Sequence, residues 1–154
     1  MIIRKAEKGD IKALAEIFRQ LHEHHVRIAP DSHRMPFAQY FELEMKTLLS
    51  DEDVCVIAAE ENGQILAYTA VRIFVRDSVD RTPARICYID HFAVDKGCRR
   101  KGVGSLLFED VKRMARDNSC DCIQLGAAAG NSDALGFYES LGMTPRTIKM
   151  ELKL

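Results

Sequence analysis

The sequence has no tryptophan, only four prolines and no excess of either charge sign. Its 22 Lys and Arg residues are balanced by 23 Asp and Glu residues, so no overall charge attracts the chain to nucleic acid or to a membrane surface. It also lacks an apolar run of the roughly 20 residues that a helix needs to span a bilayer. We therefore expect neither a nucleic-acid partner nor a membrane partner.

Signals for export and for metal binding are absent as well. The first residues, MIIRKAEKGDIKAL, are charged from Arg4 onward and contain no apolar signal core. The five cysteines are an odd number, and Cys120-x-Cys122 lacks the two-residue gap and the second pair of a zinc knuckle. We expect reduced thiols, a cytoplasmic location and no bound metal.

What is present is a patterned chain of 154 residues with 47% hydrophobic residues, enough for one domain over 1–154 with a real core. Apolar residues at helical spacing predict helices over 10–29, 37–50, 102–117 and 132–141. Apolar and β-branched runs predict strands over 2–6, 54–60, 65–75, 85–94, 122–128 and 147–154, with a loop over 77–84.

The order of these elements predicts the fold class. Asn62-Gly63 between two predicted strands is typical of a tight hairpin, so the middle of the chain is antiparallel. A strand, a helix and a strand then follow in the pattern of a parallel crossover. We expect an α/β (α+β mixed) domain, with a central mixed β-sheet flanked by helices.

Residues 97–104, GCRRKGVG, join a predicted strand to a predicted helix. The first turn of a helix has unpaired amide N–H groups, and glycine lets an anion approach them closely. Arg99, Arg100 and Lys101 would add positive charge. The pattern is neither a P-loop, since Ser105 follows the second glycine, nor the dinucleotide fingerprint. It indicates either a phosphate site or a solvated basic turn.

A second motif makes the pattern specific. Arg99-x-x-Gly102-x-Gly104 resembles the acyl-CoA signature of the GNAT superfamily of N-acetyltransferases, and residues 131–143, NSDALGFYESLGM, resemble the second half of that family's domain. The resemblance covers essentially the whole chain. It implies acetyl-CoA as the acyl donor and a sheet that splays at the acyl-CoA site.

The resemblance also implies which residues contact coenzyme A. The backbone of one strand would bind pantetheine, the turn would bind pyrophosphate, and an asparagine would bind from the following helix. These residues are Phe92, Ala93, Val94, Arg99, Arg100, Lys101, Gly102, Val103, Gly104, Ser105 and Asn131.

The chemistry needs a base and an acid. An alkylamine with a pKa of about 10.4 is almost entirely protonated at neutral pH, and the departing thiolate needs a proton. The resemblance puts Tyr138 at the sulfur as general acid, and we expect Asp90 to be the general base. Regular alternation would place Tyr88, Asp90 and Phe92 on one face and His91 on the other, unless a bulge turns His91. Alternatively, Asp90 orders water or binds the acceptor's ammonium, and Tyr138 only packs on the sheet.

The histidine cluster at 22–25 does not fit a metal site. His22 and His25 stand at i and i+3, whereas zincins use i and i+4. A packed histidine on the stripe of Leu14, Phe18 and Leu21 is one interpretation. The resemblance supplies the other, in which residues 22–34 gate the acceptor.

Together these features favour an acetyl-CoA-dependent N-acetyltransferase in which a primary amine attacks the thioester directly in a ternary complex. A small-molecule acceptor is favoured over a protein N-terminus or lysine, because charge is balanced and no further domain is predicted. The alternative is a non-catalytic acyl-CoA-binding sensor, whereas the even charge and the few aromatic residues disfavour a nucleic-acid module. By analogy with the family, residues 147–154 would pair two copies in a homodimer.

Overall fold

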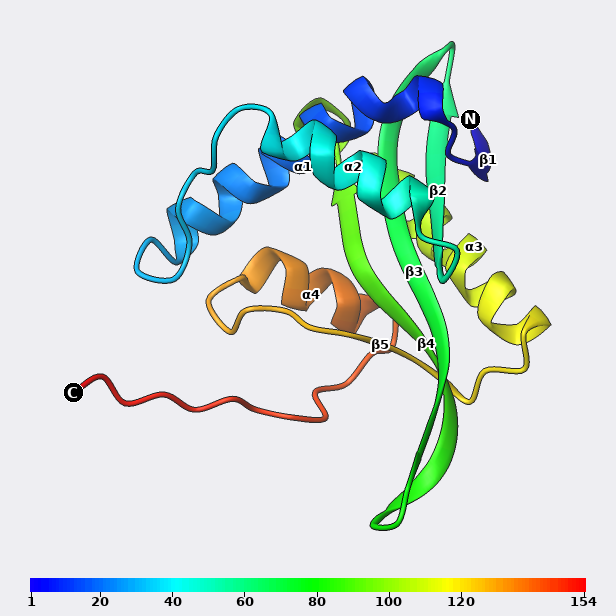
Figure 1. Ribbon diagram of the computed structural model, residues 1–154, viewed down its shortest axis with the longest axis vertical. Coiled ribbons are helices and arrows are strands. Elements are labelled where there is room, and N and C mark those ends of the chain that lie inside the picture. Colours follow the sequence, from blue (N-terminus) through cyan, green and yellow to red (C-terminus); the bar gives the residue numbers. More distant parts are fainter.

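A five-stranded sheet runs through the computed structural model, which describes residues 1–154 (Figure 1). Its strands, in spatial and chain order, are β1 (Ile2–Lys5), β2 (Val54–Glu61), β3 (Gln64–Ser78), β4 (Arg81–Val94) and β5 (Cys122–Leu125). The first four strands are antiparallel to their neighbours, whereas β5 is parallel to β4. The sheet is therefore mixed, as expected.

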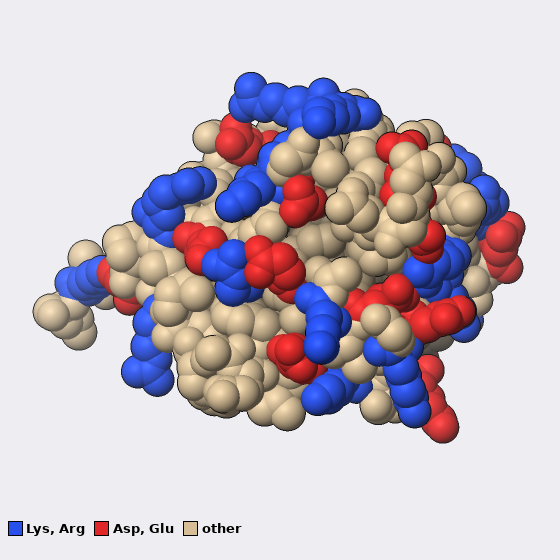
Figure 2. Space-filling view, turned by 90° about the horizontal axis from the view of Figure 1, so that it is seen from above, with Lys and Arg blue, Asp and Glu red and all other residues tan.

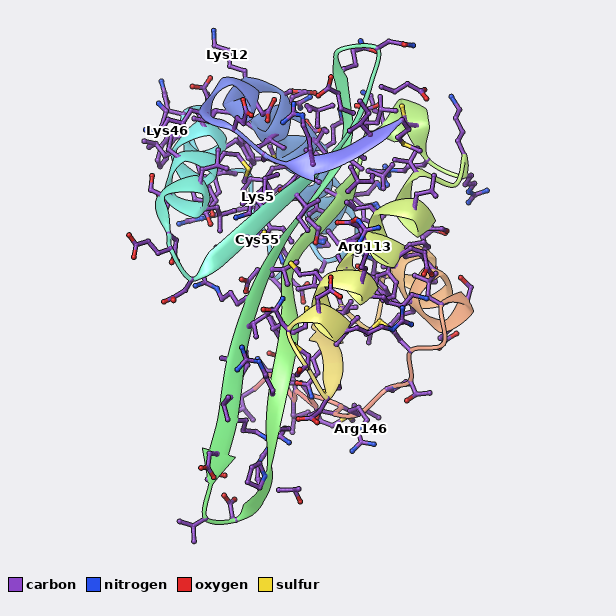
Figure 3. All side chains as sticks on the ribbon, turned by 90° about the vertical axis from the view of Figure 1, so that its right-hand side faces the viewer. Lys5, Lys12, Lys46, Cys55, Arg113 and Arg146 are labelled. Atoms are coloured by element: carbon purple, nitrogen blue, oxygen red, sulfur yellow. The ribbon has the colours of Figure 1, made fainter.

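Four helices accompany the sheet. They are α1 (Ile11–Ile28), α2 (Tyr40–Ser50), α3 (Val103–Asp117) and α4 (Ser132–Ser140). Figure 3 shows α1 and α2 on one face of the sheet and α3 on the other. Leu14, Phe18 and Met45 fill the core beneath α1 and α2, while Phe108 and Val111 fill the core beneath α3. The α/β (α+β mixed) class is confirmed.

The β2–β3 turn has the predicted geometry, because Asn62 (φ 52°) and Gly63 (φ 78°) both take the left-handed conformation of a tight hairpin.

The predicted loop over 77–84 is wrong. Strands β3 and β4 continue to Ser78 and from Arg81, and form an arm that projects from the body (Figure 1). Pro83 is tolerated there because β5 pairs with β4 only from Ile86 to Ile89, which leaves the outer edge of the arm unpaired.

The predicted strand over 147–154 is also wrong for the single chain. The segment pairs with no strand, and its side chains are exposed, for example Ile148 (76%), Met150 (85%) and Leu152 (84%). Alternation specifies a strand only where a sheet edge accepts it. The end of the tail is held by an ion pair between Lys153 and Asp31.

The surface carries both charges. Figure 2 shows Lys and Arg side chains interspersed with Asp and Glu side chains over the visible face. No helix has the length and apolar character needed to cross a membrane. All five cysteines are free thiols.

Candidate active site

The turn before α3 presents unpaired backbone donors. Gly102, the N-cap of α3, has φ +81°, and Arg100 has φ 59°. None of the amides from Arg100 to Ser105 donates a hydrogen bond within the protein. Such free N–H groups at the positive end of a helix dipole are suited to an anion, and the pyrophosphate contact expected there stays a prediction.

The cations of the turn have different roles. Arg99 Nε donates to the Val94 carbonyl at 3.1 Å, and Lys101 Nζ donates to the Gly97 carbonyl at 2.8 Å, so both side chains brace the turn. Arg100 is almost fully exposed, and its only ion pair is a long one at the surface, 3.9 Å from Asp133 Oδ1. A Cβ on Gly104 would lie 3.2 Å from Phe137 Cζ, so packing against α4 favours glycine at this position.

Next to the turn, β4 has an open edge. Its pairing with β5 ends at Ile89, whereas its pairing with β3 continues to Val94. Asp95 N–H donates to the Leu66 carbonyl of β3 at 2.8 Å. Antiparallel alternation therefore points the backbone groups of Ala93 toward β3 and those of Phe92 and Val94 toward the open edge. Of the three predicted pantetheine residues, two present their backbone outward.

A β-bulge interrupts β4 beside this edge. Val71 pairs with Ile89 and Ala70 with His91, so Asp90 is an extra residue on β4. The expected shared face of Tyr88, Asp90 and Phe92 is therefore wrong, because the bulge reverses the alternation. His91 stacks on Phe18 of α1 (ring centroids 4.7 Å apart), while Phe92 packs edge-to-face on Phe108 of α3 (6.2 Å).

The bulge, the open edge and α4 enclose a cavity of about 430 Å³. Its walls come from α1 and the segment after it (Leu21, His25, Ile28, Ala29, His33), from β4 (Ile89, Asp90, His91, Phe92), from residues 125–128, and from the start of α4 (Asn131, Ala134, Tyr138). The two predicted catalytic residues, Asp90 and Tyr138, thus lie on the walls of one cavity.

With this geometry in view, the comparisons with known proteins are decisive. The chain matches the acetyltransferase (GNAT) family over residues 13–143. The protein belongs to the GNAT acetyltransferase family. The acetyltransferase is 30% identical over 143 residues to YhfO of Bacillus subtilis, named an uncharacterized N-acetyltransferase, and the match covers 92% of this chain and 89% of YhfO.

Solved structures agree. The tetramutant of the BH1408 protein from Bacillus halodurans matches with a TM-score of 0.95 and 29% identity over 100% of both chains. The aminoglycoside acetyltransferase AAC(6')-Iy, solved with a CoA–acetylneamine bisubstrate analogue, matches with a TM-score of 0.74 over 99% of this chain and 98% of that one. At 16% identity, that match shows the fold alone. The expected enzyme class, an acetyl-CoA-dependent N-acetyltransferase, is confirmed.

The acetyltransferase's cavity holds a carboxylate, an imidazole and a phenol in different environments. Asp90 Oδ2 accepts from Arg72 Nε at 2.6 Å. His91 Nδ1 lies 3.0 Å from Tyr68 Oη, and burial lowers the pKa of His91, which favours the neutral ring. Burial raises the pKa of Tyr138 to about 12, so its hydroxyl keeps its proton at neutral pH.

Asn131 is the N-cap residue of α4. Its Oδ1 accepts from Ala134 N–H at 3.2 Å and caps α4. The same oxygen lies 3.2 Å from His24 Nε2, which ties α1 to α4. The predicted contact between Asn131 and coenzyme A stays a prediction. Because Oδ1 is occupied, the side-chain amide nitrogen would make this contact.

His25 of α1 lies beside a second histidine, a contact that the sequence did not predict. His33 comes from the segment after α1, and its ring centroid lies 5.3 Å from that of His25. Burial is the main cause that lowers the pKa of His25. No group of three or more His, Cys, Asp or Glu side chains is arranged to hold a metal ion.

Proposed function

We propose that this acetyltransferase transfers the acetyl group of acetyl-CoA to a small-molecule primary amine by direct attack in a ternary complex. The observation that carries the proposal is the shared cavity, in which Asp90 and Tyr138 flank the open edge of β4. Both substrates would therefore meet without a covalent acyl-enzyme.

The donor would be held mainly by the main chain. The amides of Arg100, Lys101, Gly102, Val103, Gly104 and Ser105 would donate to the pyrophosphate. The outward backbone groups of Phe92 and Val94 would pair with pantetheine in the manner of an added strand. A backbone N–H on the same edge would polarise the thioester carbonyl.

The acceptor side needs a proton acceptor. Asp90 Oδ1 makes no hydrogen bond within the protein, whereas Oδ2 is held by Arg72. We assign Asp90 as the base that takes the proton of the attacking amine, directly or through water. As the C–N bond forms and the C–S bond breaks, Tyr138 gives its hydroxyl proton to the departing sulfur. His91 is the second candidate base, because its neutral ring lines the same cavity.

Two substitutions test these roles. Asp90→Asn and Tyr138→Phe should each lower kcat by about 10²- to 10⁴-fold, the usual contribution of a positioned acid or base. Each should keep the rise in Tm that wild type shows with coenzyme A. Wild-type turnover in either variant would remove that residue from the mechanism. A wild-type protein that binds coenzyme A but acetylates no amine in a thiol-release panel would favour the sensor alternative.

We further propose a cytoplasmic homodimer in which the tail over 147–154 pairs with a second copy. The support is the alternation of Ile148, Met150, Leu152 and Leu154, all exposed in the single chain. Light scattering should give twice the mass of one chain, and a chain truncated after residue 146 should be monomeric. A monomeric full chain would contradict this arrangement.

A further inference from the structure

His91, which lines the cavity, has a hydrogen-bond partner in the core. Tyr68 of β3 is completely buried, and the only partner of its hydroxyl is His91 Nδ1, 3.0 Å away. Burial raises the pKa of Tyr68 well above its usual value, so the hydroxyl keeps its proton. A buried O–H group without an acceptor is costly. Tyr68 therefore donates to Nδ1 and does not accept from it.

This hydrogen bond fixes where the imidazole carries its proton. Burial lowers the pKa of His91, which favours the neutral ring, and a neutral imidazole has one N–H donor and one acceptor nitrogen. Because Nδ1 is the acceptor, the proton lies on Nε2. Neither ring nitrogen then has a free lone pair, which favours Asp90 over His91 as the base.

The Nε2–H donor has no partner within the protein. Nε2 makes no hydrogen bond and is not buried, and His91 is part of the cavity wall. The ring is held by Tyr68 at Nδ1 and by stacking on Phe18 of α1, with centroids 4.7 Å apart. The wall therefore presents a neutral hydrogen-bond donor in a fixed position.

The bulge in β4 sets this donor beside the carboxylate of Asp90. Consecutive side chains of a regular strand point to opposite faces of the sheet. Asp90, the extra residue of the bulge, accepts from Arg72, and Arg72 also donates to Asp51 at the end of α2. His91 stacks on α1, which covers the same face as α2 (Figure 3). A carboxylate and a donor thus line one cavity from consecutive residues, whose Cα atoms are about 3.8 Å apart.

We propose that His91 determines the acceptor class: its Nε2–H group donates to an oxygen of the acceptor while Asp90 binds the amine. The acceptor is then a primary amine with a hydroxyl, ether or carbonyl oxygen within a few bonds of the nitrogen. Tyr68 touches no substrate and is a positioning residue, which fixes the proton and the orientation of the ring. The inference rests on the proposed function, because it assumes that the amine lies at Asp90 in this cavity.

The position of the proton is measured directly. Long-range proton–nitrogen correlation NMR on the full chain at pH 7.5 distinguishes a protonated from an unprotonated ring nitrogen. The signals of His91 are assigned by their loss in His91→Gln. We expect a proton on Nε2 and none on Nδ1. A proton on Nδ1, or on both nitrogens, would overturn the proposal.

Matched amines test the donor. 3-Methoxypropylamine and pentylamine have the same chain length and differ by an ether oxygen against a methylene group, and 2-methoxyethylamine and butylamine form a second such pair. Calorimetry with coenzyme A present measures their dissociation constants without turnover. The ether preference is the Kd of the alkylamine divided by the Kd of the ether. Its comparison between two proteins cancels the different hydration and basicity of the two amines.

Variants assign the preference to His91. His91→Phe keeps a ring against Phe18 and removes the donor, so it should lower the ether preference of at least one pair by about three- to tenfold, the usual contribution of a hydrogen bond. His91→Gln retains an N–H donor and should lose less. Unchanged preferences in a folded His91→Phe protein, or an equal loss in His91→Gln, would overturn the proposal. The NMR measurement on wild type decides it even if His91→Phe does not fold.

Tyr68→Phe tests the positioning role. The variant leaves the ring of His91 without its partner, so the donor is no longer held in one place, and the ether preference should fall by at least about twofold. A preference equal to that of wild type would remove Tyr68 from the proposal. Because the preference compares two amines in the same protein, a general loss of stability does not change it.

Failure of the proposed function has a different signature. If coenzyme A does not raise Tm, or if no amine releases thiol from acetyl-CoA, the activity itself is wrong. A wrong role for His91 instead leaves the thermal shift and thiol release intact and leaves the ether preference unchanged in His91→Phe.

Discussion

Gly102 carries the turn that faces the predicted pyrophosphate. Its φ of +81° is costly for any residue with a Cβ, and a Cβ there would meet no atom within 4 Å. Gly102→Ala should therefore lower the free energy of unfolding by about 1–2 kcal/mol through backbone strain alone. Because relief of that strain would turn the amides away from the anion, coenzyme A should also bind more weakly. Urea unfolding and the thermal shift with coenzyme A measure the two effects.

A matched control lies in α4. Gly136 is inside that helix, its φ is ordinary, and a Cβ there would also meet no atom within 4 Å. Gly136→Ala should raise the free energy of unfolding by up to about 1 kcal/mol through helix propensity. Equal losses at Gly102 and Gly136 would show that strain at the turn is not the cause.

Single residues were predictable where the cause is local in the sequence. The spacing of Gly102 and the cations indicated either a phosphate site or a solvated basic turn, and the family resemblance favoured the phosphate site. The structure has unpaired amides there, and anion binding stays a prediction. The packing role of Gly104 was not predictable, because Phe137 is distant in sequence. The same holds for the pairing of Arg72 with Asp90, since no local spacing joins residues 18 positions apart on two strands.

At the scale of elements, Gly104 sets the distance between α3 and α4. Its missing Cβ leaves room for the ring of Phe137, which is also packed against Phe92 with centroids 5.7 Å apart. Gly104→Ala should destabilise the protein by about 1–3 kcal/mol, the usual cost of overpacking. In a Phe137→Leu background the added loss should be smaller, which a double-mutant cycle on unfolding free energies measures. Strict additivity would show that the two helices do not meet through this contact.

Periodicity predicted the elements that pack on the core. The helical stripes of α1 and α3 and the first five predicted strands all appear, with boundaries shifted by a few residues. The β3–β4 arm was missed because Thr82-Pro83 is typical of a loop, while an unpaired strand edge accepts proline. The predicted strand over 147–154 was wrong for the single chain, because alternation does not reveal whether a sheet edge in the same chain is free to pair with the segment.

The whole molecule should lose stability in mild acid. Burial lowers the folded-state pKa values of His25 and His91, while in the unfolded chain both titrate near about 6.5. Below that pH the unfolded chain binds protons that the folded chain refuses, so the free energy of unfolding falls as pH falls toward the folded-state values. Urea midpoints at pH 7.5 and pH 5.5 measure this loss.

Titration of carboxylates contributes little to the stability difference between pH 7.5 and pH 5.5. The pKa values of Asp10 and Glu16 are lowered by Arg4 and Arg19 respectively, so their contributions are lost only at more acidic pH. The double variant His25→Gln, His91→Gln should show a smaller difference between the two midpoints. A double variant as sensitive to pH as wild type would assign the effect to other groups.

Convergence over the whole molecule was the least predictable feature. His25 and His33 flank the break after α1, and His91 lies on a distant strand, yet all three line one cavity. The sequence motifs predicted that Asp90 and Tyr138 belong to one site through the family resemblance. Which faces Asp90 and His91 take depends on the bulge in β4, and alternation in the sequence does not reveal a bulge before the strands are paired.

The bulge has a consequence for insertions and deletions. Ile89 pairs with Val71 and His91 with Ala70. Removal of Asp90 would make Ile89 and His91 neighbours in sequence, opposite the neighbours Val71 and Ala70, and would remove the bulge. The ladder on either side would keep its present register, and every other side chain of β4 would keep its face. Asp90 has no pairing partner on β3, so the sheet does not need it. The fold can be completed without it, whereas the cavity would lose its only carboxylate and Arg72 would lose one of its two partners.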